Sequence, residues 1–179
     1  SLNNLASVRE AQGRSSEAEG LYRQALEIAR NTIGEGHPNY AAGLNNLASV
    51  VQAQGRYPEA EGLFRQALDI ARTTIGEEHP NYATHLNNLA GAIMAQNRFP
   101  EAESLYRQAH DIDRIELGEG HPDYAIDLGN LGSCLAAQDK PEEARPLLTQ
   151  ALEIFRATLP PDHPHITETL NRIANLPTP

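Results

Sequence analysis

The sequence is poor in cysteine, in lysine and in long apolar runs, and each shortage excludes a class of protein. Cys134 is the only cysteine among 179 residues, which excludes a disulfide framework and a multi-cysteine metal site. No apolar run approaches the ~20 residues that a membrane-spanning helix needs. Lys and Arg number 14 against 24 acidic residues, so the formal net charge is -10. We therefore expect neither a nucleic-acid partner nor a membrane partner, because both attract clustered Lys and Arg.

The chain does contain a strong internal repeat of 42 residues. Leucine recurs at this spacing at Leu2, Leu44, Leu86, Leu128 and Leu170. A His-Pro pair recurs at residues 37–38, 79–80, 121–122 and 163–164. Residues 13–54 and 55–96 are identical at 30 of 42 positions. Four periods and 11 further residues fill the length, which leaves no room for a separate catalytic domain.

Each period has the pattern of two helices. Pro38 suits a first helical position, and Leu44, Leu47, Ala48 and Val51 then fall on one face of a helix. A break follows at residues 55–56, and a second apolar face begins after a further proline at position 58. Tandem helix pairs of this kind predict an all-α fold, an α-solenoid in which each unit buries its apolar stripe against its neighbours.

We divide the chain by this period. The predicted units are an incomplete repeat 1 (1–36), repeat 2 (37–78), repeat 3 (79–120), repeat 4 (121–162), a capping helix (163–175) and a tail (176–179) that frays or serves as a linker. Pro146 is expected to kink the second helix of repeat 4. Because repeat 1 lacks the His-Pro segment, we expect a larger array, self-association through this end, or an arbitrary chain boundary.

The order of small and aromatic residues within the period resembles the tetratricopeptide repeat. The matching residues are Leu44, Leu47, Ala48, Gly55, Tyr57, Ala60, Phe64 and Ala67. Leu-Asn-Asn-Leu-Ala at 44–48, Gly-Arg-Tyr at 55–57, Glu-Ala-Glu at 59–61 and Gly-Glu-Glu-His-Pro at 76–80 are similar to the kinesin light chain type of this repeat. The resemblance covers essentially the whole chain. It implies a right-handed solenoid whose first helices line a concave groove.

Asparagines and a serine are expected to line this groove. The candidate peptide-binding residues are Asn3, Asn4, Asn45, Asn46, Ser49, Asn87, Asn88 and Asn130. A carboxamide both donates and accepts hydrogen bonds, so a row of them can pair with the backbone of an extended peptide. The resemblance implies the same use, since kinesin light chains hold cargo peptides with asparagines at matching positions. Alternatively, the asparagines bond to neighbouring helices and staple repeat to repeat, and the two roles can coexist.

Residues that could carry chemistry follow the repeat. The four histidines of the His-Pro pairs are expected to cap or pack helices, while His85 and His110 are interpreted as drift between copies. The carboxylates form pairs with Arg one turn away on solvated helix faces, such as Glu61 with Arg65, and no acid is distinguished from its copies. Cys134 is expected to be a small buried residue. We therefore predict no catalytic residue, no metal site and no cofactor.

Together these observations predict a non-catalytic, cytoplasmic protein–protein interaction module or scaffold that binds an extended peptide segment of a partner. The alternative is a structural self-assembly module, in which the repeats stack end to end into an oligomer without a peptide ligand. An enzyme would need a domain outside these 179 residues.

Overall fold

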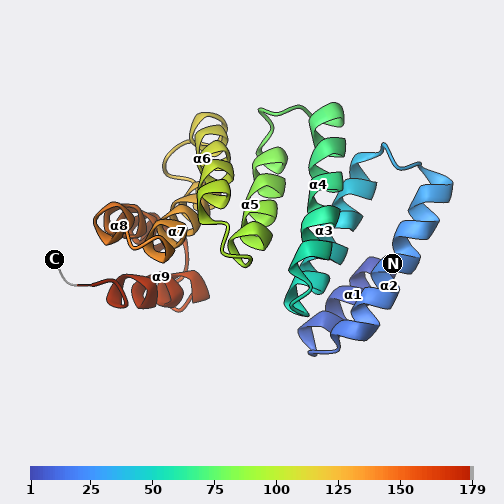
Figure 1. Ribbon diagram of the computed structural model, residues 1–179, viewed down its shortest axis with the longest axis horizontal. Coiled ribbons are helices and arrows are strands. Elements are labelled where there is room, and N and C mark those ends of the chain that lie inside the picture. The colour runs from blue at the N-terminus through green and yellow to red at the C-terminus, as the bar shows by residue number, and fades with distance from the viewer. Residues whose placement is uncertain (178–179) are drawn as a thin grey trace.

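A computed structural model describes residues 1–177, which form nine α-helices packed as consecutive hairpin pairs (Figure 1). The helices are α1 (Leu2–Ala11), α2 (Ser15–Thr32), α3 (Pro38–Ala53), α4 (Tyr57–Thr74), α5 (Pro80–Met94), α6 (Phe99–Glu116), α7 (Pro122–Ala137), α8 (Pro141–Thr158) and α9 (Pro164–Ala174). They follow one another along the molecule from α1 at one end to α9 at the other. The predicted all-α arrangement of repeated helix pairs is confirmed.

The His-Pro pairs start the first helix of each repeat. Nδ1 of His37, His79, His121 and His163 accepts the backbone N–H two residues ahead, at 3.0–3.3 Å. The proline that follows occupies a position whose N–H would have no helical partner. The predicted capping role of these histidines is confirmed.

The turn between the two helices of a repeat requires a positive φ. Gly55 provides it without strain at φ 77°, and the copies of this position are Asn97 (φ 62°) and Asp139 (φ 59°). Asn and Asp are the non-glycine residues that tolerate this region best. The turn between the two helices therefore keeps its backbone conformation although the residue with positive φ differs between repeats.

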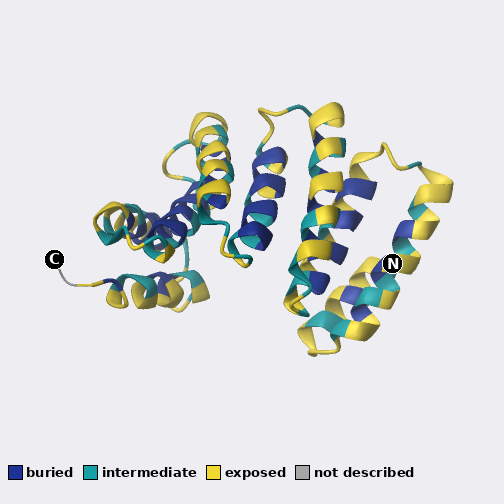
Figure 2. Ribbon diagram, viewed as in Figure 1, coloured by how far each residue is buried: buried dark blue, intermediate teal, exposed yellow. Residues whose placement is uncertain are grey.

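Alanines let the helices approach closely. Ala48 and Ala90 of the first helices and Ala60 and Ala102 of the second helices are completely buried. From α3 to α8 the first helix of each pair is the more deeply covered one; α5 is almost entirely buried or half-buried, whereas α4 keeps an exposed face (Figure 2). In the first pair α1 is mostly exposed, with only Ala6 buried. Direct contacts of α5 with both α3 and α7 add to this burial.

Two sequence-based expectations concern the C-terminal end. Helix α8 continues through Pro146, which is the sixth residue of the helix and removes a single backbone hydrogen bond, and a kink at this residue stays a prediction. The first tail residues do not fray: Leu176 is 8% exposed within the core, and Arg145 Nη2 donates to the Pro177 carbonyl at 2.6 Å. The remaining residues of the predicted tail, 178–179, lie outside the described part of the chain.

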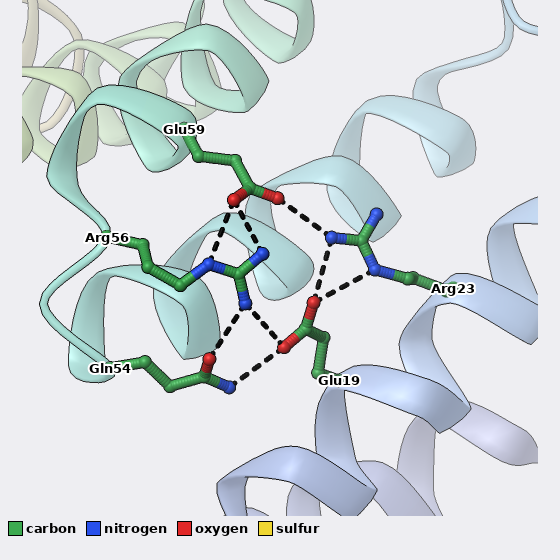
Figure 3. Close-up of polar contacts among 5 residues, drawn as sticks. All are labelled: Glu19, Arg23, Gln54, Arg56 and Glu59. Atoms are coloured by element: carbon green, nitrogen blue, oxygen red, sulfur yellow. Dashed lines mark hydrogen bonds and ion pairs between the residues drawn. The ribbon is translucent and has the colours of Figure 1, made fainter.

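An ion network joins each repeat to the next (Figure 3). Glu19 accepts hydrogen bonds from Arg23 of its own helix at 2.8 Å and from Gln54 (3.0 Å) and Arg56 (2.8 Å) of the following repeat. Glu59 accepts from both arginines and closes the ring. The side chain of Glu19 is only 15% exposed. The expectation of a solvated surface pair is therefore wrong, since the next repeat covers it.

The same network recurs around Glu61, which Gln96 (2.7 Å) and Arg98 (2.7 Å) bond from the next repeat. Burial by itself would raise the pKa of Glu61, but the hydrogen bonds from Gln96, Arg65 and Arg98 outweigh burial and lower that pKa. Around Glu103 the arginine is replaced by Lys140, at a longer 3.4 Å. The network is therefore weakest between the last two full repeats.

We expect Glu61→Gln to lower the free energy of unfolding by about 1–2 kcal/mol at neutral pH, because a largely covered acceptor of charged hydrogen bonds is lost. The lowered pKa makes this contribution present above the ordinary glutamate value of 4.5 and lost as the pH falls through the folded value. Urea unfolding of both proteins at pH 7 and near about pH 3 measures the difference. Glu103→Gln is the matched control and should lose less free energy of unfolding at pH 7. If the parent and Glu61→Gln differ as much at acidic pH as at neutral pH, the stabilising role of the ionised Glu61 is contradicted.

Candidate functional site

The first helices α3, α5 and α7 share a surface that is hollowed at two places, and we call this surface the groove. Hollow A has a volume of about 330 Å³ between α3, α5 and the end of α4. Its apolar residues are Ala41, Ala42, Ala71 and Ile75, and its amides include those of Asn39, Asn45, Asn46 and Asn81. Hollow A thus combines an apolar lining with several hydrogen-bonding groups.

Hollow B, of about 420 Å³, continues the groove one turn further along α3. Phe64 and Tyr106 of the second helices contribute aromatic lining. Its polar residues are Ser49, Gln52, Asn87, Asn88 and Asn130. The absence of a side chain at Gly91 keeps space open, since a Cβ there would lie 3.6 Å from the Tyr106 hydroxyl.

The structure brings most of the predicted groove residues together. Asn45 and Asn46 line hollow A, whereas Ser49, Asn87, Asn88 and Asn130 line hollow B. Asn3 and Asn4 are exposed on α1 and line neither hollow. The site that the geometry defines therefore lies on α3, α5 and α7.

In the Asn-Asn pairs of α3 and α5, the first asparagine bonds to the next repeat. Oδ1 of Asn45 lies 3.4 Å from Nδ1 of His85 on α5. Asn87 Nδ2 donates a short hydrogen bond to Asp127 Oδ1 on α7, and Asn87 Oδ1 accepts from Asn130 at 3.4 Å. These contacts tie α3 to α5 and α5 to α7, as the stapling alternative proposes.

The second asparagine of each pair is left available. Asn46 is exposed and Asn88 is half-buried, and neither side chain forms a hydrogen bond with another residue of the described chain. Both amides therefore retain their donors and acceptors for a ligand. Within one motif, only the first asparagine reaches the next repeat, because successive side chains on a helix point 100° apart.

The groove is electrically neutral around its hollows. No Lys, Arg, Asp or Glu lines either hollow. Burial lowers the pKa of His85 and raises the pKa of Tyr106, so both side chains are uncharged at neutral pH. A neutral, partly apolar groove favours a ligand whose bound portion carries no charge, because nothing in it would compensate a desolvated ion.

A buried carboxyl pair lies beneath this surface. Asp113 of α6 is 3% exposed and Asp127 of α7 is 1% exposed, and the two are close enough to hydrogen-bond. Burial, and then the neighbouring carboxyl, raises the pKa of Asp127. Asp113 Oδ1 and Asp127 Oδ2 have no other donor in the described structure. A proton retained by the pair lets one carboxyl donate to the other.

Two sequence-based interpretations are wrong here. His85 is not drift, since it lines hollow A and contacts Asn45. Asp127 is an acid that differs from its copies, which include Gly43, His85 and Thr169. The sequence did contain a signal for both residues, because each differs from its copies in otherwise similar repeats, and such a difference points to a local role.

No group of three or more His, Cys, Asp or Glu is placed to hold a metal ion within residues 1–177. Burial raises the pKa of the Cys134 thiol, which disfavours the reactive thiolate. Over the same residues, no helix is both long and apolar enough to cross a membrane.

Comparison with known families gives a match over most of the sequence. A family model described as tetratricopeptide repeat matches residues 1–73, 40–114, 81–157 and 128–176, which overlap. No curated protein sequence matches at a significant level.

Several solved structures are similar in fold. TPR-like repeats from a Podosopora anserina protein assigned as a kinesin light chain superpose with a TM-score of 0.80 at 29% identity, covering 98% of this chain and 83% of that one. BtubC (BKLC) from P. vanneervenii gives a TM-score of 0.84 at 25% identity, covering 98% of this chain and 70% of that one. The apo form of RapI, at 19% identity and a TM-score of 0.81, covers 98% and 61% and shows the fold alone.

Proposed function

Because this chain belongs to the tetratricopeptide repeat family, whose members are usually non-catalytic and bind protein partners, we propose that it is a cytoplasmic interaction module. Its groove binds an extended, uncharged peptide segment of a partner protein. The observation that carries this proposal is the alignment of hollows A and B along α3 and α5, with the unbonded amides of Asn46 and Asn88 between neutral walls.

The chemistry of the groove suits a peptide backbone. The amides of Asn46 and Asn88 each offer a donor and an acceptor, which an extended peptide backbone can satisfy. Ser49 and Asn130 provide further polar groups in hollow B, and Asn45 and Asn87 tie the helices of the groove together. Asn3 and Asn4, on α1, lie outside the two hollows. At about 1 kcal/mol for each hydrogen bond, a few such contacts with apolar burial give roughly micromolar affinity.

A peptide-display selection tests this proposal. We expect peptides selected on the parent chain to bind about tenfold or more weakly to the variant Asn46→Ala/Asn88→Ala, because two hydrogen-bonding amides are lost. The folded content of the variant should not change, since neither amide bonds to the protein. Gln24→Ala/Gln66→Ala removes two exposed amides from outer helices α2 and α4 and is the matched control. Equal binding by all three proteins would refute the groove as the site.

The self-assembly alternative is favoured by a different observation. Leu5 (44%), Val8 (52%), Ile28 (54%) and Ile33 (44%) are large apolar side chains exposed on and beside α1 and α2. The copies of Leu5 and Val8 in the next repeat, Leu47 and Val50, are at most 2% exposed. A molar mass in light scattering that rises with protein concentration supports assembly through this end, whereas a constant mass supports the peptide-binding module alone.

A further inference from the structure

A third hollow lies away from the groove, on the outer helix α6 and the loop before α5. It has a volume of about 250 Å³ and is lined by Glu78, Asp111, Ile112, Ile115 and Glu116. We call it the outer hollow. Ile115 is 71% exposed, the highest value among the exposed large apolar side chains of the described chain.

Three of these residues differ from their copies in the other repeats. Ile115 replaces Asn31, Thr73 and Ala157. Glu116 replaces Thr32, Thr74 and Thr158. Glu78 replaces Gly36 and Gly120, while the copy in repeat 4 is also acidic, Asp162. In a chain whose repeats are otherwise so similar, the departures at Ile115 and Glu116, which meet at one hollow beside Glu78, mark a local function rather than a requirement of the fold.

The departure at Glu116 does not help the fold. The hydroxyls of Thr32, Thr74 and Thr158 donate to backbone carbonyls in the last turn of their helices, at 2.7–2.8 Å. An ionised glutamate cannot donate this bond, and it places a negative charge at the negative end of the α6 dipole. Ile115 likewise exposes apolar surface to water. Neither residue therefore stabilises the isolated chain at its position, whereas a bound partner could cover Ile115 and pair with Glu116.

The carboxylates of the outer hollow are available to a cation. Glu78 and Glu116 form no ion pair with another described residue. Asp111 has weak partners only, Arg114 at 3.9 Å and His110 at 3.3 Å. The hollow therefore presents an apolar centre inside a rim of negative charge.

We propose that the outer hollow is a second interaction surface, which binds a partner segment with an aliphatic or aromatic side chain flanked by Lys or Arg. The apolar side chain covers Ile112 and Ile115, and the basic residues pair with Glu78 and Glu116. Charge complementarity selects this occupant, because an acidic or uncharged segment would leave the carboxylates unpaired. This surface lies on α6 and the α4–α5 loop, so its occupancy is independent of the groove.

The test is a selection from a random displayed-peptide library on a chain whose groove is disabled by Asn46→Ala/Asn88→Ala. We expect enrichment of peptides with one large apolar residue beside Lys or Arg. These peptides should bind at least about tenfold more weakly to a further variant with Glu78→Gly, Ile115→Thr and Glu116→Thr, which are residues of the other copies. Rising salt should also weaken binding to the parent.

The second variant, Glu78→Gln/Glu116→Gln, keeps the size and shape of the two side chains and removes their charges. It should lose the salt dependence while Ile115 keeps part of the affinity. The proposal is overturned if nothing is enriched, if the enriched peptides lack basic residues, or if they bind the substituted chains as tightly as the parent.

Discussion

Replacing Asp127 by Asn is expected to stabilise the protein by about 1–3 kcal/mol at pH 8, an uncommon outcome for a change in a core. The side chain is 1% exposed, and its neighbour Asp113 is almost as deeply buried. An Asn at this position can still accept from Asn87 through Oδ1 and can donate to Asp113 Oδ1 through Nδ2. The substitution thus removes a buried ionisable group, gives Asp113 Oδ1 a donor and replaces the oxygen Asp127 Oδ2, which lacks one, by that donor.

The effect should depend on pH in a defined direction. The folded pKa is raised, to about 6 for Asp113 and about 8 for Asp127, from an ordinary value of 3.8. The contribution of the pair is therefore fully present below the ordinary value and is lost as the pH rises through the folded values. The parent should lose stability between about pH 4 and pH 8, and the variant should lose much less.

Urea unfolding of the parent and of Asp127→Asn across that range measures both slopes. Asp123→Asn is the control, since its exposed carboxylate lies near the pair and close to His121, at 3.7 Å. Removing its charge should change the slope little. Parallel pH profiles for the parent and Asp127→Asn would show that the pair does not hold a proton.

Replacing Gly132 by Ala is expected to destabilise the protein by about 1–3 kcal/mol, although the other copies of this position are alanine. A Cβ at residue 132 would lie 2.8 Å from Leu148 Cγ and 3.3 Å from the Ala144 carbonyl oxygen. Both contacts are too close, and one of them is with backbone. In the preceding repeat, Ala90 fits because Tyr106 occupies the position of Leu148.

A compensating substitution tests this cause. The double variant Gly132→Ala/Leu148→Tyr recreates the pair found in the preceding repeat, Ala90 with Tyr106. We expect it to recover part of the stability that Gly132→Ala loses, so the two changes should not be additive in thermal unfolding. An increase in stability from Gly132→Ala alone would mean that the helix propensity of alanine outweighs the clash.

Local patterns in the sequence were sufficient for much of the architecture. The 42-residue period, the apolar face of each helix and the His-Pro pairs predict the helix pairs and their caps, because these depend on residues close in the chain. Helical geometry was enough to choose Asn45, Asn46, Ser49 and Asn88 as residues of the first-helix surface.

Contacts between repeats were decided only by the tertiary structure. Asn45 and Asn46 are neighbours in one motif, yet Asn45 contacts His85 of the next repeat, whereas the side chain of Asn46 forms no hydrogen bond with another residue among 1–177. The carboxyl pair likewise brings together Asp113 of α6 and Asp127 of α7. The close contact expected for an alanine at residue 132 of α7 is with residues of α8. Such features depend on the distance between helices, which packing sets and the spacing of residues along the chain does not encode.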